Sequence, residues 1–151
     1  MKPSQRLAEL GMTLPEVAAP VGSYVPALRN GTQVLTSGQL PFRDGKVLYT
    51  GKVPTDVSIE NAADGAAVAM LNAVAAAAQA AGGIDAIKRV VRVCVFVNSD
   101  ADFSQQPKVA NGASDLLVKI FGDAGRHVRA AVGAAALPLN AAVEVELTVE
   151  I

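Results

Sequence analysis

The sequence is poor in the residues that build disulfides, zinc sites and stacking surfaces. Its 151 residues include one cysteine, one histidine and no tryptophan, and aromatic residues make up only 4% of the chain. One cysteine excludes a disulfide within the chain, and one histidine leaves no credible set of zinc ligands. The few aromatic rings offer little surface on which nucleic-acid bases could stack. We therefore expect a cytoplasmic protein without a zinc site.

Charge and hydropathy argue against two further classes of partner. The formal net charge is −1, so the chain has no general attraction for a phosphate backbone. The N-terminal stretch Met1–Arg6 lacks the apolar core of a secretory signal. The longest apolar stretch, Ala62–Ala81, is interrupted by Asp64 and Asn72 and is a poor candidate for a membrane span. We expect neither a nucleic-acid partner nor a membrane partner.

Small aliphatic residues are abundant, and their spacing predicts an α+β fold. Hydrophobic residues make up 51% of the chain, which is long enough to bury one sizeable core. Helical spacing and strand-like runs alternate along the chain, and the two expected long helices would cover one face of a mixed sheet. The expected helices span residues 4–10, 63–81 and 107–121, and the expected strands span residues 24–29, 32–37, 46–49, 90–97, 128–136 and 143–151.

Local signals set the ends of these elements. Asn30-Gly31 and Asp44-Gly45 are typical of tight turns, so the strands of the first fifty residues are expected to form one meander. Thr55, Asp56 or Ser58 can cap the long helix that Gly82-Gly83 ends.

The strand at residues 90–97 is almost continuously apolar, which predicts a central strand covered on both faces. Within it, Cys94 is expected to be a buried small hydrophobe and not a nucleophile.

The last quarter of the chain contains the most informative charged residue. Arg129 lies on an expected strand among small apolar residues, where its five fixed donors need a carboxylate, a phosphate or water. The alternation of residues 143–151 places Glu144, Glu146 and Glu150 on one face of the following strand. If these two strands form a hairpin or lie near each other in one sheet, Arg129 and the glutamates lie close together.

Each candidate residue also has an ordinary structural interpretation. Taken alone, an arginine such as Arg129 is more often a structural or surface ion-pairing residue than a ligand anchor, and a glutamate such as Glu144 is more often one of a solvated row than a catalyst. His127, two residues before Arg129, is interpreted as an exposed strand residue, with proton donation as the alternative. Ser37-Gly38 is either an ordinary turn or a hydroxyl beside an approachable backbone amide, and Asn111 can cap or bond locally in its helix.

Several separated stretches, taken in their order and spacing, resemble the Rid (YjgF) family of reactive-intermediate deaminases. The resemblance spans about residues 22–151 and leaves residues 1–21 as an N-terminal helical arm on a single Rid-like domain. The matching stretches are Gly22–Tyr24, Ser37–Pro41, Leu71–Val74, Ala80–Gly82, Asp102–Phe103, Val109–Asn111, Arg129, Leu137–Pro138 and Glu144–Glu146.

The resemblance implies a chorismate-mutase-like fold, a homotrimer, and a cleft at each subunit interface. It implies hydrolysis of enamine or imine acids, such as 2-aminoacrylate, to 2-keto acids and ammonia without a cofactor. Arg129 falls at the position that holds the substrate carboxylate, and Glu144 at that of the acid which positions water or moves a proton. The other pocket positions fall on Tyr24, Ser37, Gly38, Asn111 and Ala131.

Two departures from the family pattern point to a divergent subgroup. Ala131 stands where a cysteine is typical, and the arm and the stretch between Phe103 and Asn111 are longer than in compact members. The alternative function is a non-catalytic trimer that binds a small carboxylate metabolite and regulates a partner. Endoribonuclease activity, which has been attached to some relatives, is less favoured because the chain is slightly acidic and poor in aromatic residues.

Overall fold

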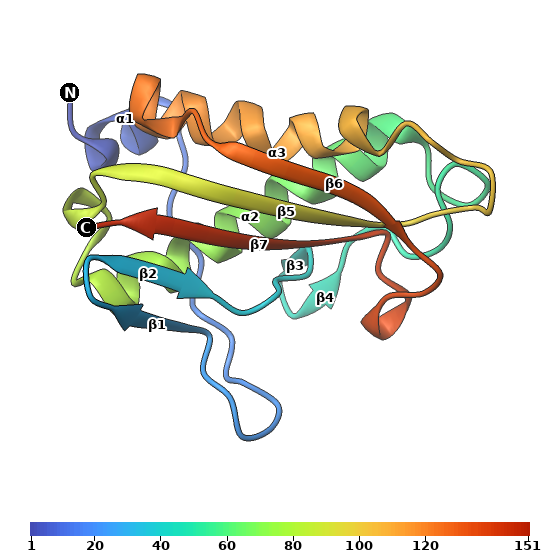
Figure 1. Ribbon diagram of the computed structural model, residues 1–151, viewed down its shortest axis with the longest axis horizontal. Coiled ribbons are helices and arrows are strands. Elements are labelled where there is room, and N and C mark those ends of the chain that lie inside the picture. Colours follow the sequence, from blue (N-terminus) through green and yellow to red (C-terminus); the bar gives the residue numbers. More distant parts are fainter.

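Five strands form one mixed sheet, and two long helices cover one of its faces (Figure 1). This computed structural model describes residues 1–151. Strands β5 and β6 are parallel, and the other neighbouring pairs are antiparallel. The predicted α+β arrangement is therefore confirmed. The strands, in spatial order, are β1 (Ala27–Asn30), β2 (Gln33–Thr36), β7 (Val143–Glu150), β5 (Arg89–Asn98) and β6 (Val128–Ala134).

The helices end where the local sequence indicated, and α2 begins at one of the expected caps, four residues before the start of the expected range. Helix α2 spans Ile59–Ala81, and its N-cap Ser58 accepts a hydrogen bond from the Asn61 amide at 3.1 Å. Gly82 ends α2 in the left-handed region, with a φ of 89°. Helix α3 spans Gln106–Phe121 and is followed by Gly122.

Helices α2 and α3 pack unusually closely against each other. A Cβ atom at Gly112 of α3 would lie 1.9 Å from the Ala63 carbonyl oxygen of α2, so only a residue without a side chain fits there. Beneath the helices, a core of 30 buried residues joins them to the sheet and includes Met70, Val93 and Leu117. The close contact fixes the position of α3 relative to the rest of the layer.

The first fifty residues form two separate hairpins, so the prediction of one meander is wrong. Strands β1 and β2 pair in the main sheet, but Asn30 pairs with Gln33, which moves the turn one residue later than expected, to Gly31–Thr32. Strands β3 (Phe42–Arg43) and β4 (Lys46–Val47) form their own two-stranded sheet. Their turn, Asp44–Gly45, has φ angles of 53° and 76°, as a primed hairpin turn requires.

The N-terminal arm packs on the helix layer before it reaches the sheet. Its helix α1 (Pro3–Glu9) buries Leu7 in the core, and Ser4 bonds to the Asp85 carboxylate through its amide at 2.9 Å and its hydroxyl at 2.6 Å. The chain that leads into β1 then projects from the body as a long loop, at the bottom of Figure 1.

The face of the sheet opposite the helices is open in the single chain. Strand β5 is therefore covered on one face and not on both, which corrects the prediction. Cys94 is half-buried on the open side, where it pairs with Glu146 of β7 and Ala130 of β6. Exposed aliphatic side chains lie on the open face at Leu28, Leu35, Val128 and Val132.

No helix in the chain is both long enough and apolar enough to cross a bilayer.

Candidate functional site

Arg129 lies on β6, one of the two edge strands, and its side chain turns toward the helix layer. It pairs in register with Val93, which is fully buried beneath the helices. One nitrogen, Nη1, donates to Asn111 Oδ1 at 2.9 Å and to Ser114 Oγ at 3.1 Å, both on α3. Within the chain the Nε and Nη2 atoms donate to no acceptor, and no carboxylate forms an ion pair with Arg129. The interpretation of Arg129 as a surface ion-pairing residue is therefore wrong for the single chain.

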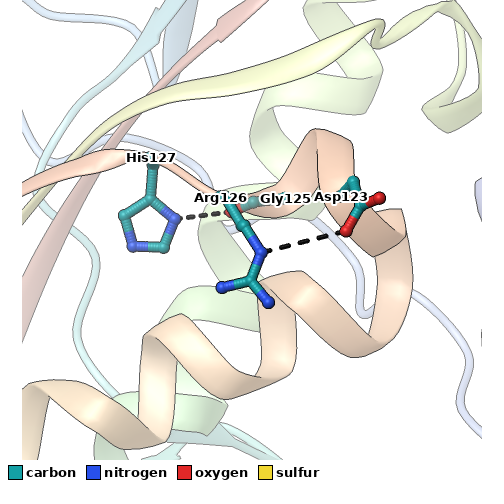
Figure 2. A network of polar contacts seen from close by, with 4 residues as sticks. All are labelled: Asp123, Gly125, Arg126 and His127. Carbon is teal, nitrogen blue, oxygen red and sulfur yellow. Dashed lines mark hydrogen bonds and ion pairs between the residues drawn. The ribbon is translucent and has the colours of Figure 1, made fainter.

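His127 precedes β6 and is bonded at both ring nitrogens, so the interpretation of an exposed strand residue is also wrong. Figure 2 shows the imidazole turned toward the segment that follows α3, where Nδ1 lies 2.6 Å from the Gly125 carbonyl oxygen. A carbonyl oxygen only accepts hydrogen bonds, so Nδ1 holds a proton. The other nitrogen, Nε2, lies 2.9 Å from Ser114 Oγ and in the neutral ring accepts the hydroxyl proton.

Ser114 is the residue of this group that the sequence analysis missed. It lies three residues after Asn111, so both side chains project from the same face of α3. The spacing of two polar residues on the helix that precedes Arg129 was the available signal. Ala131, two residues beyond Arg129, projects to the same side of β6 and packs against the core.

A second group of the expected site residues lies at the end of β2. A Cβ atom on Gly38 would lie 2.9 Å from Cδ of Glu144, so the carboxyl group rests directly against the glycine. Ser37 Oγ donates to the Val25 carbonyl at 2.6 Å, which ties β2 to the loop that carries Tyr24. Tyr24 is 52% exposed on that loop.

The environment of Glu144 favours its protonated form. Burial raises the pKa of the Glu144 carboxyl above its ordinary value of 4.5, and repulsion from Glu146 raises it further. A carboxyl group with a raised pKa can hold and release a proton closer to neutral pH.

The two groups lie on opposite faces of the sheet, which contradicts the expectation that Arg129 and the glutamate row lie close together. Strand β5 separates β6 from β7. Arg129 pairs with Val93 on the helix face, whereas Glu144 pairs with Phe96, three residues further along β5 and therefore on the open face. The short connection before β7 suggested a hairpin, but β5 pairs with both strands and keeps them apart.

The cavities of the single chain do not unite these groups. A cavity of about 880 Å³ lies between the N-terminal arm, α2 and the β3–β4 hairpin, and neither Arg129 nor Glu144 lines it. A second, of about 550 Å³, lies beside His127 at the end of the sheet, where Arg89, Arg126 and Glu150 also line it. No cluster of three or more histidine, cysteine, aspartate or glutamate residues is placed to hold a metal ion.

Three features define the class of the protein. They are a mixed sheet with two helices on one face, an arginine on an edge strand, and a glutamate on the open face. The chain matches the sequence model of the YjgF/chorismate mutase-like, putative endoribonuclease family over residues 4–151. It belongs to that family, which confirms the suspected relationship and the chorismate-mutase-like fold.

Individual relatives resemble the chain over almost its whole length, including the N-terminal arm. Protein TCP17 of Trypanosoma cruzi is 44% identical over 146 residues, which cover 96% of this chain and 91% of that protein. The solved structure of a putative endoribonuclease from Shewanella oneidensis is 40% identical with a TM-score of 0.95 and covers 100% of both chains. That of a protein of unknown function from Agrobacterium tumefaciens is 43% identical with a TM-score of 0.90 and covers 99% of this chain and 92% of that one.

Proposed function

We propose that this protein is a homotrimeric hydrolase of reactive enamine and imine acids. In the reaction, water adds to the carbon of the C=N group, the C–N bond breaks, and a 2-keto acid and ammonia are released. Arg129 binds the substrate carboxylate at a subunit interface, and Glu144 positions the water or moves its proton.

The observation that carries the proposal is the arrangement of Arg129. Asn111 and Ser114 hold one end of its guanidinium through Nη1, and Nε and Nη2 have no acceptor in the chain. These two nitrogens form the fork that binds a carboxylate in a bidentate manner, a geometry that the single ammonium group of lysine cannot reproduce. The absence of an ion-pairing carboxylate within the chain supports a ligand carboxylate as the partner.

A shared site also accounts for the separation of the two groups of residues. Arg129 and Glu144 face opposite sides of one sheet, so one chain cannot bring both to the same substrate. In a cyclic assembly, the β6 edge of one subunit meets the open face of the next, and the site combines Arg129 from one copy with Ser37, Gly38 and Glu144 from its neighbour.

The exposed apolar side chains of the open face support such an assembly. Val128 is 62% exposed and Leu28 is 52% exposed in the single chain, where contact with another copy would bury them. Light scattering is expected to give three times the chain mass of 15.4 kDa. A mass of one chain would contradict the trimer.

The direct test of activity supplies imino acids generated in situ by a pyridoxal-phosphate enzyme and measures keto-acid release. The purified protein is expected to accelerate release, and Arg129→Ala is expected to abolish the acceleration. Arg129→Lys is the matched control, because it keeps the charge but loses the fork, and we expect it to remain strongly impaired. No acceleration by the wild type, or full activity in Arg129→Ala, would refute the proposal.

Subunit mixing tests whether the site is shared. Trimers assembled from equal amounts of inactive Arg129→Ala and inactive Glu144→Gln chains contain some sites with both residues intact. With random mixing, roughly one quarter of the sites regain both groups, and activity returns to that extent. If the mixed trimers stay inactive although they form, the two residues do not act in one interface site.

A non-catalytic carboxylate-binding trimer is the second candidate, and Ala131 favours it. Ala131 stands beside Arg129 where the family resemblance led us to expect a cysteine, so the pocket floor is altered. This candidate predicts saturable binding of pyruvate or 2-oxobutyrate, lost in Arg129→Ala, without turnover of any imine.

A further inference from the structure

We propose that Ser114 and His127 are positioning residues that orient Arg129. This inference rests on the proposed function, because it assigns new roles within the same site.

The hydrogen bonds form an ordered chain from the backbone to the guanidinium. The Gly125 carbonyl, 2.6 Å from Nδ1, fixes the ring (Figure 2). Nε2 then points at Ser114. The Ser114 hydroxyl donates to Nε2 at 2.9 Å and accepts from Arg129 Nη1 at 3.1 Å. Each bond fixes the direction of the next, so the His127 ring holds the Ser114 oxygen where it accepts from Arg129.

Two pairs of matched variants test the positioning role. Ser114→Ala removes the bridge, whereas Ser114→Thr keeps the hydroxyl. His127→Asn keeps a donor near the Nδ1 position but reaches no further, whereas His127→Gln places an amide oxygen near the Nε2 position to accept from Ser114. We expect Ser114→Ala and His127→Asn to raise KM about tenfold, the loss of one hydrogen bond to a charged group. Ser114→Thr and His127→Gln are expected to recover most of that loss.

The outcomes separate this inference from the proposed function. If Arg129→Ala abolishes pyruvate binding while Ser114→Ala leaves KM and binding unchanged, the positioning role is wrong and the proposed function stands. If Arg129→Ala binds pyruvate as the wild type does, both proposals fail together.

Discussion

The carboxyl group of Glu144 rests against Gly38, and replacing Gly38 with alanine tests whether this contact positions the carboxyl group. The new Cβ atom would lie 2.9 Å from Cδ and 3.0 Å from Oε1 of Glu144. Non-bonded carbon atoms pack at roughly 3.5–4.0 Å, so the carboxyl group must move by roughly 0.6–1.1 Å. Because the obstacle is the end of a flexible side chain and not backbone, the variant is expected to fold.

The displacement sets the expected magnitude. A misplacement of about 1 Å in a group that acts on substrate costs on the order of 100-fold in rate. Crowding of this kind costs roughly 1–3 kcal/mol in a tightly packed core, and we expect the lower end here because Glu144 is only half-buried.

A double-mutant cycle gives the sharpest assay. Keto-acid release is measured for Gly38→Ala, and thermal unfolding for Gly38→Ala, Glu144→Ala and the double variant. In the Glu144→Ala background the obstacle is gone, so adding Gly38→Ala is expected to change the melting temperature very little. Full activity in Gly38→Ala, or an undiminished loss of melting temperature in the Glu144→Ala background, would show that the contact does not position the carboxyl group.

Three other perturbations have defined outcomes. Gly112→Ala places Cβ 1.9 Å from the Ala63 carbonyl, so we expect urea unfolding to show a loss of roughly 3 kcal/mol or more; a loss below 1 kcal/mol would mean that the helices separate easily. Because burial raises the pKa of Glu144 in the folded state, its ionisation opposes folding as pH rises above its ordinary 4.5. Glu144→Gln is therefore expected to raise the melting temperature at pH 7 but not near pH 3, and equal effects at both would contradict the assignment. Hydrogen bonds from Ser4 lower the pKa of Asp85 below its ordinary 3.8, so the contact stabilises the arm above that pH and is lost as pH falls through the folded-state value. Asp85→Ala is expected to speed proteolysis of the arm at pH 7, and unchanged cleavage would show that other contacts hold it.

The features that the sequence predicted well are those that depend on neighbours along the chain. The spacing of apolar residues identified α2 and α3, and Gly82 and Gly122 marked their ends because helix termination is a local event. The turn at Asp44–Gly45 was predictable for the same reason. Whether its two short strands join the main sheet depends on distant partners, and this prediction failed.

Strand order was the feature that local patterns did not contain. Alternation places Glu144 on one face of its own strand. Which strand lies beside β7 depends on the crossover connection through α3, which makes β6 parallel to β5. The same crossover brings Ser114 to Arg129. Composition gave no indication of the contact between Ser114 and Arg129. The family resemblance identified Asn111, which lies one helical turn earlier, and the structure shows that Asn111 accepts a hydrogen bond from the same guanidinium.

The single imidazole of this chain has a practical consequence. Because His127 is the one histidine in 151 residues, its ring protons and nitrogens give magnetic resonance signals that no other imidazole overlaps. The ring lies two hydrogen bonds from Nη1 of Arg129, through Ser114. A change in these signals during titration with a 2-keto acid would report occupancy at the arginine directly, without a label or a substituted residue.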